Sequence, residues 1–451
     1  MINGMKVLFV NTNDISGGAA RAAMRIMRGV QQSGVDTQMF VKDKYSKSSD
    51  VIPLSTFTPS SNWLFDIFKW VIQKFKNRYH MFKWHPYKRT KLNVFMSDLR
   101  HTDIHGALQK LDYDIVHLHW INNRFLDIRE LAKIHKPIVW TLHDSWPFCG
   151  VCHYFIDCER YQTHCGACSM LGSKKEQDLA YEIFEKKLEA YKDLDLHIVT
   201  PSRWLGDSAK KSALLGRFPV HVIPNCLDTD LFRPLSAEEI RVIAEHQQNA
   251  VVSRVFSEAM QEKRIEKPFV LYGAMNAAND RRKGFASLLS ALQILDAQGF
   301  EAHLVVFGAN EQELPMKFQN IDVTFVGYIH DSSVLTALYI IADVMVVPSL
   351  TENLSNAIME SLSCGTPVVG FDIGGNGDMI DHKKNGYLAE EKDSKDLAQG
   401  IEWCIAQNAD GILSKNAREK VLNNFTIDIV SEQYKELYES LVCNNRLSYA
   451  K

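Results

Sequence analysis

Short β-branched or aliphatic runs alternate with longer amphipathic stretches along the whole chain. This alternation is typical of repeated strand–helix units, which fold into parallel sheets covered by helices. The predicted strands form two series, separated by a turn-rich stretch at 224–228 and a polar helical stretch over 237–267. The first series comprises residues 6–11, 115–119, 138–143, 197–200 and 220–223, and the second comprises 269–273, 303–308, 323–327, 344–348 and 367–372. The sequence therefore predicts an α/β fold with two parallel sheets.

The length of the chain, 451 residues, is about three times that of a usual domain, so we expect at least two cores. We place an N-terminal Rossmann-like domain over 1–225 with a cysteine-rich insertion at 149–168, a linker and helix over 226–267, a C-terminal Rossmann-like domain over 268–425, and a C-terminal helix and tail over 426–451. The periodicity does not show which domain the last helix covers. Two doubly wound domains that face each other bring the carboxyl ends of both sheets to one cleft, where ligands of such folds bind.

Charge and hydropathy argue against two classes of protein. The 51 basic and 54 acidic residues give a net charge of -3, which does not suit a nucleic-acid partner. The N-terminus lacks the pattern of a signal peptide, and no run reaches about 18 apolar residues, so we expect a cytoplasmic protein that does not span a membrane. Because the cytosol keeps thiols reduced, the nine cysteines are not expected to form a disulfide framework.

Two loops that follow predicted strands have the composition of anion-binding loops. Gly17 and Gly18 precede a helical pattern and let a ligand approach backbone N–H groups; the absence of GxGxxG argues against NAD, and a tight structural turn is an equal alternative. Arg281, Arg282 and Lys283 precede a helix that begins near Phe285, which suits a diphosphate. The alternative for these cations is a solvated surface.

The stretch 348–375 carries two carboxylates, Glu352 and Glu360, whose spacing indicates a ligand site. Glu352 follows a strand, the polar loop 353–356 leads into a helix, and Glu360 lies about one turn inside that helix. One carboxylate can therefore address a sugar hydroxyl while the other accepts hydrogen bonds from a ribose. Two solvated glutamates would be the default for an isolated pair, but the strand and glycine pair that come after them argue against it.

These motifs, in this order, resemble the retaining glycosyltransferases of family 4, which have the GT-B fold. Glu352 to Glu360 matches the E-x7-E motif of that family, and the loops at 16–20 and 282–284 match its glycine and phosphate loops. The resemblance implies a donor site that comprises Gly17, Gly18, Arg282, Lys283, Asn353, Leu354, Ser355 and Glu360. In it, the two cations bind the pyrophosphate, Glu360 binds the ribose and Glu352 lies beside the donor sugar. Many members carry an arginine after the preceding strand; this chain has Gly273-Ala274-Met275, so Arg281 is the candidate substitute.

A histidine at a strand end completes the resemblance. His143 matches the family's active-site histidine, which lies over the donor sugar, although a lone histidine in this position is more often structural. His117 and His119 alternate along one strand and face one side, and a role in the cleft or in the core stays open for both.

The resemblance implies a retaining transfer, through an ion-pair-like state, from a nucleotide diphosphate sugar to an acceptor. The candidate catalytic residues are His143, Glu352 and Lys283. The leaving diphosphate can take the acceptor proton, so no protein nucleophile and no catalytic metal or other cofactor is required. A noncatalytic nucleotide-sugar-binding partner and a GT-B sugar nucleotide epimerase are the alternatives.

Five of the nine cysteines lie within 149–168, as two CxxC pairs with a fifth thiol between them. Four thiolates can complete a tetrahedral structural zinc site; free buried thiols and disulfides formed after lysis are the alternatives. A similar segment occurs in a subgroup that resembles exopolysaccharide and colanic acid enzymes. The resemblance implies that the zinc ligands are Cys152, Cys158, Cys165 and Cys168, with Cys149 as the spare.

The stretch 62–89 mixes aromatic and basic residues, which suits the headgroup region of an anionic membrane. An amphipathic helix packed on the first domain is the alternative. The cysteine-bearing subgroup implies surface polysaccharide synthesis, with a glycan or lipid-linked acceptor. A protein peripheral to the inner face of the membrane would fit that setting.

Overall fold

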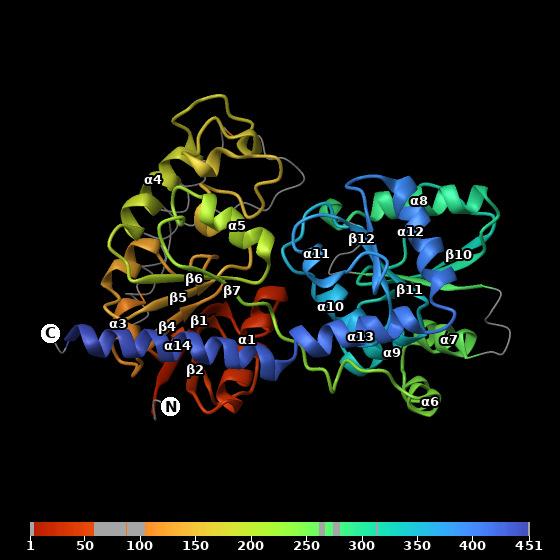
Figure 1. Ribbon diagram of the computed structural model, residues 1–451, viewed down its shortest axis with the longest axis horizontal. Helices are drawn as coiled ribbons and strands as arrows, with labels where there is room; N and C mark the ends of the chain where they lie inside the picture. The colour runs from red at the N-terminus through yellow and green to blue at the C-terminus, as the bar shows by residue number, and fades with distance from the viewer. Residues whose placement is uncertain are drawn as a thin grey trace, which may run out of the picture. The chain divides into compact units, whose positions relative to one another are not determined.

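The computed structural model describes residues 4–57, 87, 104–260, 267–273, 280–312 and 314–449, with side chains up to 443. The chain forms two compact units (Figure 1). Unit 1 contains the residues up to Ile223 together with those from Ser431 onward, and unit 2 contains Pro224–Val430. The stretch 62–89, with the membrane contact predicted for it, lies outside the described residues except for Tyr87. Among the helices that are described, none is both long and apolar enough to cross a membrane.

Unit 1 is built on a seven-stranded parallel sheet with the order β3-β2-β1-β4-β5-β6-β7. Its strands are β1 (Lys6–Asn13), β2 (Asp36–Asp43), β3 (Val51–Pro53), β4 (Ile115–Leu118), β5 (Ile138–Thr141), β6 (Leu196–Thr200) and β7 (Val220–Val222). Its α-helices are α1 (Gly18–Gln32), α3 (His105–Leu108), α4 (Leu179–Tyr191), α5 (Arg203–Lys211) and, from Ser431, most of α14 (Ile427–Tyr449). Short 3-10 helices are η1 (Leu54–Thr56), η2 (Ile128–Lys133), η3 (Trp146–Phe148), η4 (Arg160–Gln162) and η5 (Ser169–Leu171).

Unit 2 has a six-stranded parallel sheet with the order β10-β9-β8-β11-β12-β13. Its strands are β8 (Phe269–Gly273), β9 (Ala302–Phe307), β10 (Ile321–Gly327), β11 (Val344–Val347), β12 (Val368–Phe371) and β13 (Gly386–Ala389). Its helices are α6 (Ala237–Glu245), α7 (Ala250–Ala259), η7 (Arg281–Lys283), α8 (Phe285–Ala297), α9 (Ser332–Ile341), α10 (Asn356–Ser363), α11 (Asn376–Met379), α12 (Ser394–Gln407) and α13 (Ile412–Asn424).

The strands β8, β11 and β12 of the unit 2 sheet are buried throughout, which explains why they are continuous apolar runs. Successive side chains of β11 enter different cores: Met345 and Val347 pack with α9 and α10, whereas Val344 and Val346 pack with α8 and α12. This alternation is the expected result of the strand's two-residue period. Unit 2 is therefore a doubly wound α/β domain.

The predicted α/β fold with two parallel sheets is confirmed, and every predicted strand is present within a few residues of its predicted bounds. Three strands were not predicted, β2, β3 and β13. The predicted helical stretch over 237–267 contains two helices, α6 and α7, and residues 261–266 of it lie outside the described part of the chain. The last helix, which periodicity did not assign, belongs to unit 1 from Ser431.

Candidate active site

Three loops of unit 2 meet at one edge of its sheet, because they come after the neighbouring strands β8, β11 and β12. Two glycines allow this close approach. Gly284, at the end of η7, has a φ of 71°, and a Cβ there would lie 1.7 Å from the Pro348 carbonyl oxygen. Gly374 has a φ of 52°, and its Cβ would lie 1.8 Å from the Glu352 carbonyl oxygen. A residue with a side chain would push the loops apart at either position.

The loop that follows β8 carries its cations in ion pairs. Lys283 Nζ donates to Glu352 Oε2 at 2.7 Å, so the structure brings together two of the predicted catalytic residues. Arg282 Nη2 donates to Asp280 Oδ2 at 2.6 Å, and Asp280 also accepts the Arg282 N–H as the N-cap of η7. Burial acts to raise the pKa of Asp280, but the hydrogen bonds and charge of Arg282 and the charge of Lys283 together outweigh it and hold that pKa below its ordinary value. Arg281 is exposed.

The E-x7-E segment leads from β11 into α10 as predicted. Asn353, Leu354 and Ser355 are buried in the approach to the helix, and Ser355 is its N-cap. Glu360 is 9% exposed, and its Oε2 accepts a hydrogen bond from the Tyr339 hydroxyl at 3.2 Å. Tyr339 lies on α9, so the carboxylate that is predicted to bind ribose is held by a neighbouring helix.

Sequence analysis did not single out three polar residues that follow β11 and β12. Ser349 Oγ, Asn356 Oδ1 and Asn376 Oδ1 are buried and have no hydrogen-bond partner among the described residues. Leaving such an atom unsatisfied costs roughly 1–3 kcal/mol, so these atoms are suited to a ligand or an ordered water. Each stands just after a strand or at the first position of a helix, a signal that could have identified it.

The unit 1 candidates also lie at one sheet edge, after the neighbouring strands β1, β4 and β5. Gly17 is the N-cap of α1 with a φ of 94°, and Gly18 begins the helix. A Cβ at Gly17 would meet no atom within 4 Å, so the space over this turn is open. His119 follows β4, and His143 follows β5.

Three histidine rings lie close together at this edge. His119 Nδ1 lies 2.9 Å from His143 Nε2, and the His119 ring lies 4.2 Å from the ring of His117, centroid to centroid. Burial lowers the pKa of His143 to about 4 and lowers the pKa values of His117 and His119 well below 6.5. The three rings are therefore neutral near pH 7. The structure assigns His117 to the buried core and places His119 against the predicted active-site residue.

Asp144 connects the end of β5 to the cysteine-rich segment. Its Oδ2 accepts from Trp120 Nε1 at 3.1 Å and pairs with His153 Nδ1 at 2.6 Å, and its Oδ1 accepts the Trp146 N–H. Burial acts to raise the pKa of Asp144, but His153 and the Trp146 N–H outweigh burial and lower it. The segment that carries the cysteines is thereby anchored directly beside His143.

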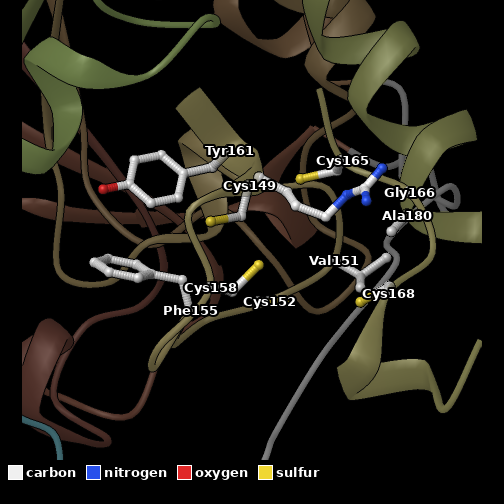
Figure 2. Close-up of a pocket in the computed structure, with 11 residues that line it drawn as sticks. Cys149, Val151, Cys152, Phe155, Cys158, Tyr161, Cys165, Gly166, Cys168 and Ala180 are labelled. Carbon is white, nitrogen blue, oxygen red and sulfur yellow. The ribbon is translucent and has the colours of Figure 1, made fainter. Parts of the chain in front are cut away.

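The five clustered thiols line one pocket, as Figure 2 shows. All five are free, and as placed they do not form a group of three or more metal-ligating side chains in the described part of the chain. Backbone N–H groups point at the sulfurs nevertheless: Gly150 donates to Cys165 Sγ at 3.2 Å, and Met170 and Leu171 donate to Cys168. Burial raises the pKa of Cys165 to about 12, and the Gly150 N–H acts in the opposite direction, because such donors stabilise thiolates rather than thiols. The donor set therefore suits a soft metal ion such as zinc.

A buried lysine lies under this pocket. Lys187 Nζ donates to the carbonyl oxygens of Cys149 at 2.7 Å and Gly150 at 3.2 Å, and it lies 3.6 Å from the centre of the Trp146 ring. Burial lowers the pKa of Lys187 to about 7. Negative charge on the neighbouring sulfurs would favour its ammonium form.

Comparisons with known proteins identify the family and the class of fold. Residues 16–231 match the family described as Glycosyltransferase Family 4, and residues 266–407 match the family described as Glycosyl transferases group 1. Among solved structures, sucrose-phosphate synthase from Thermosynechococcus elongatus superposes with a TM-score of 0.62 at 18% identity, covering 98% of this chain and 100% of that one. Two doubly wound domains that align in this way define the GT-B class of fold. Within that class, the chain belongs to glycosyltransferase family 4.

Curated relatives match at low identity. UDP-Gal:alpha-D-GlcNAc-diphosphoundecaprenol alpha-1,3-galactosyltransferase of Escherichia coli is 33% identical over 103 residues, which span 23% of this chain and 27% of that protein. The Escherichia coli K12 protein named "Putative colanic acid biosynthesis glycosyl transferase WcaC" is 22% identical over 340 residues, 73% of this chain and 76% of that protein.

Proposed function

We propose that the protein transfers a sugar, with retention of configuration, from a nucleotide diphosphate donor to a glycan or lipid-linked acceptor in surface polysaccharide synthesis. The observation that carries this proposal is the Lys283–Glu352 ion pair at the edge where the loops after β8, β11 and β12 meet. It puts the predicted phosphate cation and the predicted sugar-side carboxylate in direct contact. Retention rests on the family.

When the donor binds, its diphosphate replaces Glu352 as the ion-pair partner of Lys283. Lys283 and Arg282 then neutralise the charge that develops on the leaving diphosphate, as preorganised donors do. Glu352, released from Lys283, accepts a hydrogen bond from a donor sugar hydroxyl, and Glu360 accepts from the ribose. For His143, the family resemblance implies a role beside the donor sugar. The acceptor proton passes to the leaving diphosphate, so the reaction needs no protein nucleophile.

Relatives narrow the substrates to test. The Anabaena protein HepE, which has a TM-score of 0.58 and 16% identity to this chain, was crystallised in complex with UDP-glucose. The Escherichia coli galactosyltransferase is named for a UDP-Gal donor and a diphosphoundecaprenol-linked acceptor, and an Erwinia amylovora relative is named for amylovoran biosynthesis. These names support a UDP-hexose donor and a lipid-linked acceptor as the first pair to assay.

The test is calorimetric binding of UDP, GDP and ADP, and of their common sugars, to the wild type and to Glu360→Ala, followed by turnover with a diphosphoundecaprenol-linked acceptor. We expect one nucleotide class to bind and the substitution to abolish its binding. Binding without transfer to any acceptor would favour the noncatalytic partner, and release of a modified sugar nucleotide would favour the epimerase. If no nucleotide binds, the donor site is wrong.

We also propose that Cys152, Cys158, Cys165 and Cys168 hold a structural zinc ion. The support is the convergence of the thiols on one pocket, the N–H donors to the sulfurs of Cys165 and Cys168, and the buried Lys187 amine that donates to the Cys149 carbonyl oxygen. A zinc ion held by four thiolates carries a net negative charge, which Lys187 offsets. Zinc would hold together the segment that Asp144 anchors beside His143.

Metal analysis of protein purified without chelator tests the zinc site. We expect one zinc per chain, retained by Cys149→Ser and lost by Cys165→Ser, with a lower melting temperature after chelation. Nine thiols that titrate freely in metal-free protein, with no change in melting temperature on adding chelator, would contradict it.

A further inference from the structure

We infer that His119 is a positioning residue that fixes the tautomer and orientation of His143, and that two tyrosines of α14 stabilise this pair through His117 and Thr141. The importance of His143 for transfer rests on the proposed function. The hydrogen bond between the two histidines does not, because it is present in the free protein. The two parts can therefore be tested separately.

The geometry holds the two rings firmly. His119 Nδ1 and His143 Nε2 are 2.9 Å apart, and the rings are stacked with centroids 5.2 Å apart. The Phe9 ring also stacks with His119, with centroids 5.5 Å apart and an interplanar angle of 14°. The backbone is also fixed, since Trp140 Nε1 donates to the His119 carbonyl oxygen at 3.0 Å. His119 thus has little freedom to turn away from His143.

The proton between the two rings can be assigned from what surrounds them. Both imidazoles are neutral, so only one of the two facing nitrogens carries a proton. His119 Nε2 is buried and has no partner among the described residues. Buried N–H groups without an acceptor are rarer in folded proteins than under-used acceptors, so the bare nitrogen belongs at Nε2. His119 therefore donates from Nδ1 to His143 Nε2, and His143 carries its own proton on Nδ1.

This tautomer restricts what His143 can do. With Nε2 occupied as an acceptor for His119, His143 cannot use that nitrogen as a general base. It can act as a neutral hydrogen-bond donor through Nδ1, which suits a sugar hydroxyl or a developing negative charge better than it suits proton abstraction.

A second row of hydrogen bonds lies two residues back along each strand. His117 Nε2 and Thr141 Oγ1 are 2.8 Å apart, Tyr438 OH lies 2.7 Å from His117 Nδ1, and Tyr434 OH lies 2.9 Å from Thr141 Oγ1. Tyr434 and Tyr438 are one turn apart on α14 and so share a face. Figure 1 shows this helix, in blue, lying along the unit 1 sheet. The helix thus fixes the strand residues from which His119 and His143 extend.

The tautomer is tested by long-range proton–nitrogen correlation NMR on protein labelled with nitrogen-15 in histidine, with signals assigned by His143→Gln and His119→Phe. We expect Nδ1–H on His143 in the wild type and a mixture of tautomers in His119→Phe, which keeps the stacked ring but removes the donor. An Nε2–H tautomer of His143 in the wild type would overturn the inference.

Kinetics of three variants give a readout that a merely structural role would not move. We expect His119→Phe to lower kcat about tenfold with donor KM unchanged, since one hydrogen bond is lost. His119→Asn, whose amide can donate from the place of Nδ1, should recover kcat to within about threefold, and Tyr438→Phe should lower it about threefold because it acts through His117. His330→Phe, at an exposed histidine of unit 2, is the matched control.

The outcomes separate the two claims. If His119→Asn loses as much kcat as His119→Phe, or if both lose it only in proportion to melting temperature, His119 is structural and the inference fails. If the wild type turns over and His143→Ala is as active, the proposed role of His143 fails while the NMR result still decides the tautomer.

Discussion

The candidate site residues of the two units lie at equivalent sheet edges but differ in charge: ion pairs dominate in unit 2 and neutral histidine rings in unit 1. In unit 2 the loops after β8 and β11 place charges in pairs, Lys283 with Glu352 and Arg282 with Asp280. In unit 1 the segments after β4 and β5 place the neutral rings of His119 and His143 against each other, because burial lowers the pKa of both, and the Asp144 carboxylate that follows them pairs with His153. The same strand scaffold thus supports charge neutralisation in one unit and neutral hydrogen bonding in the other. The side chains of the loops, rather than the strands that carry them, determine this character.

The largest expected effect concerns the charged edge. Lys283→Ala should lower kcat/KM by about 100- to 1,000-fold, because it removes a cation that stabilises the leaving diphosphate. Steady-state kinetics with the nucleotide found by calorimetry measures this effect. Lys395→Ala, at an exposed lysine of the same unit, is the control. Equal activity of the two variants would show that Lys283 does not stabilise the leaving diphosphate, and that the ion pairs of unit 2 have no role in the reaction.

A substitution of Gly284 tests whether the loops of unit 2 must approach each other closely. Gly284→Ala should destabilise unit 2 by about 3 kcal/mol, because a Cβ there meets the Pro348 carbonyl oxygen and the backbone has a positive φ. Gly299→Ala, with a φ of 80° and open space around its Cβ, should cost only about 1 kcal/mol. Urea unfolding of both variants compares them. Similar losses would mean that the loops adjust without cost.

Acidification should destabilise unit 1 more than unit 2. A histidine with a folded pKa below its unfolded value binds a proton more readily when unfolded, so stability is lost as pH falls through 6.5 toward the folded pKa. Among the described residues, unit 1 carries three such histidines beside its site, His117, His119 and His143, and a fourth, His221, in β7, whereas unit 2 carries His303. We expect unit 1 to lose about 2 kcal/mol more than unit 2 between pH 7.5 and pH 5.

Hydrogen exchange of β4 and β5 peptides against β8 and β11 peptides measures this difference. Asp280 does not contribute in this window, because its pKa is lowered from an already acidic value. A smaller difference in His119→Phe would attribute the effect to the stacked rings. Equal protection of the two sheets at pH 5 would show that these histidines do not govern unit 1.

The smallest effect concerns the support of Glu360. Tyr339→Phe removes the hydroxyl that donates to Glu360 Oε2, so nucleotide affinity should fall about tenfold, the equivalent of one hydrogen bond to a charged group. Calorimetry of this variant against Tyr328→Phe, at an exposed tyrosine, measures the loss. Unchanged affinity would mean that the hydrogen bond from Tyr339 does not contribute to nucleotide binding by Glu360.

Local patterns predicted the fold where strands are buried and apolar, as in β4 and β11. They failed at β2, whose first residues, Asp36, Thr37 and Gln38, look like a loop, and at β13, where Gly386 allows the backbone to approach Val368. Those strands exist because neighbouring strands pair with them, which no local pattern records.

In the site, too, features that depend on residues close in sequence could be predicted, whereas contacts between residues far apart in sequence could not. The E-x7-E spacing and the clustering of the cysteines could be predicted, because both depend on residues close in sequence. The pairing of Glu360 with Tyr339 and of His143 with His119 could not, since each joins residues more than twenty positions apart. Arg282 was predicted as a phosphate ligand, but its pairing with Asp280 depends on the geometry of η7.

The chain returns to unit 1 only at Ser431, after the whole of unit 2. During synthesis, unit 2 is therefore contiguous and can fold as soon as it leaves the ribosome, while unit 1 waits for its last helix. Until then His117 and Thr141 lack the tyrosine hydroxyls that they bond in the finished fold. A chain that ends before Ser431 would contain all of unit 2 but an incomplete unit 1, with the sheet face that α14 covers left exposed.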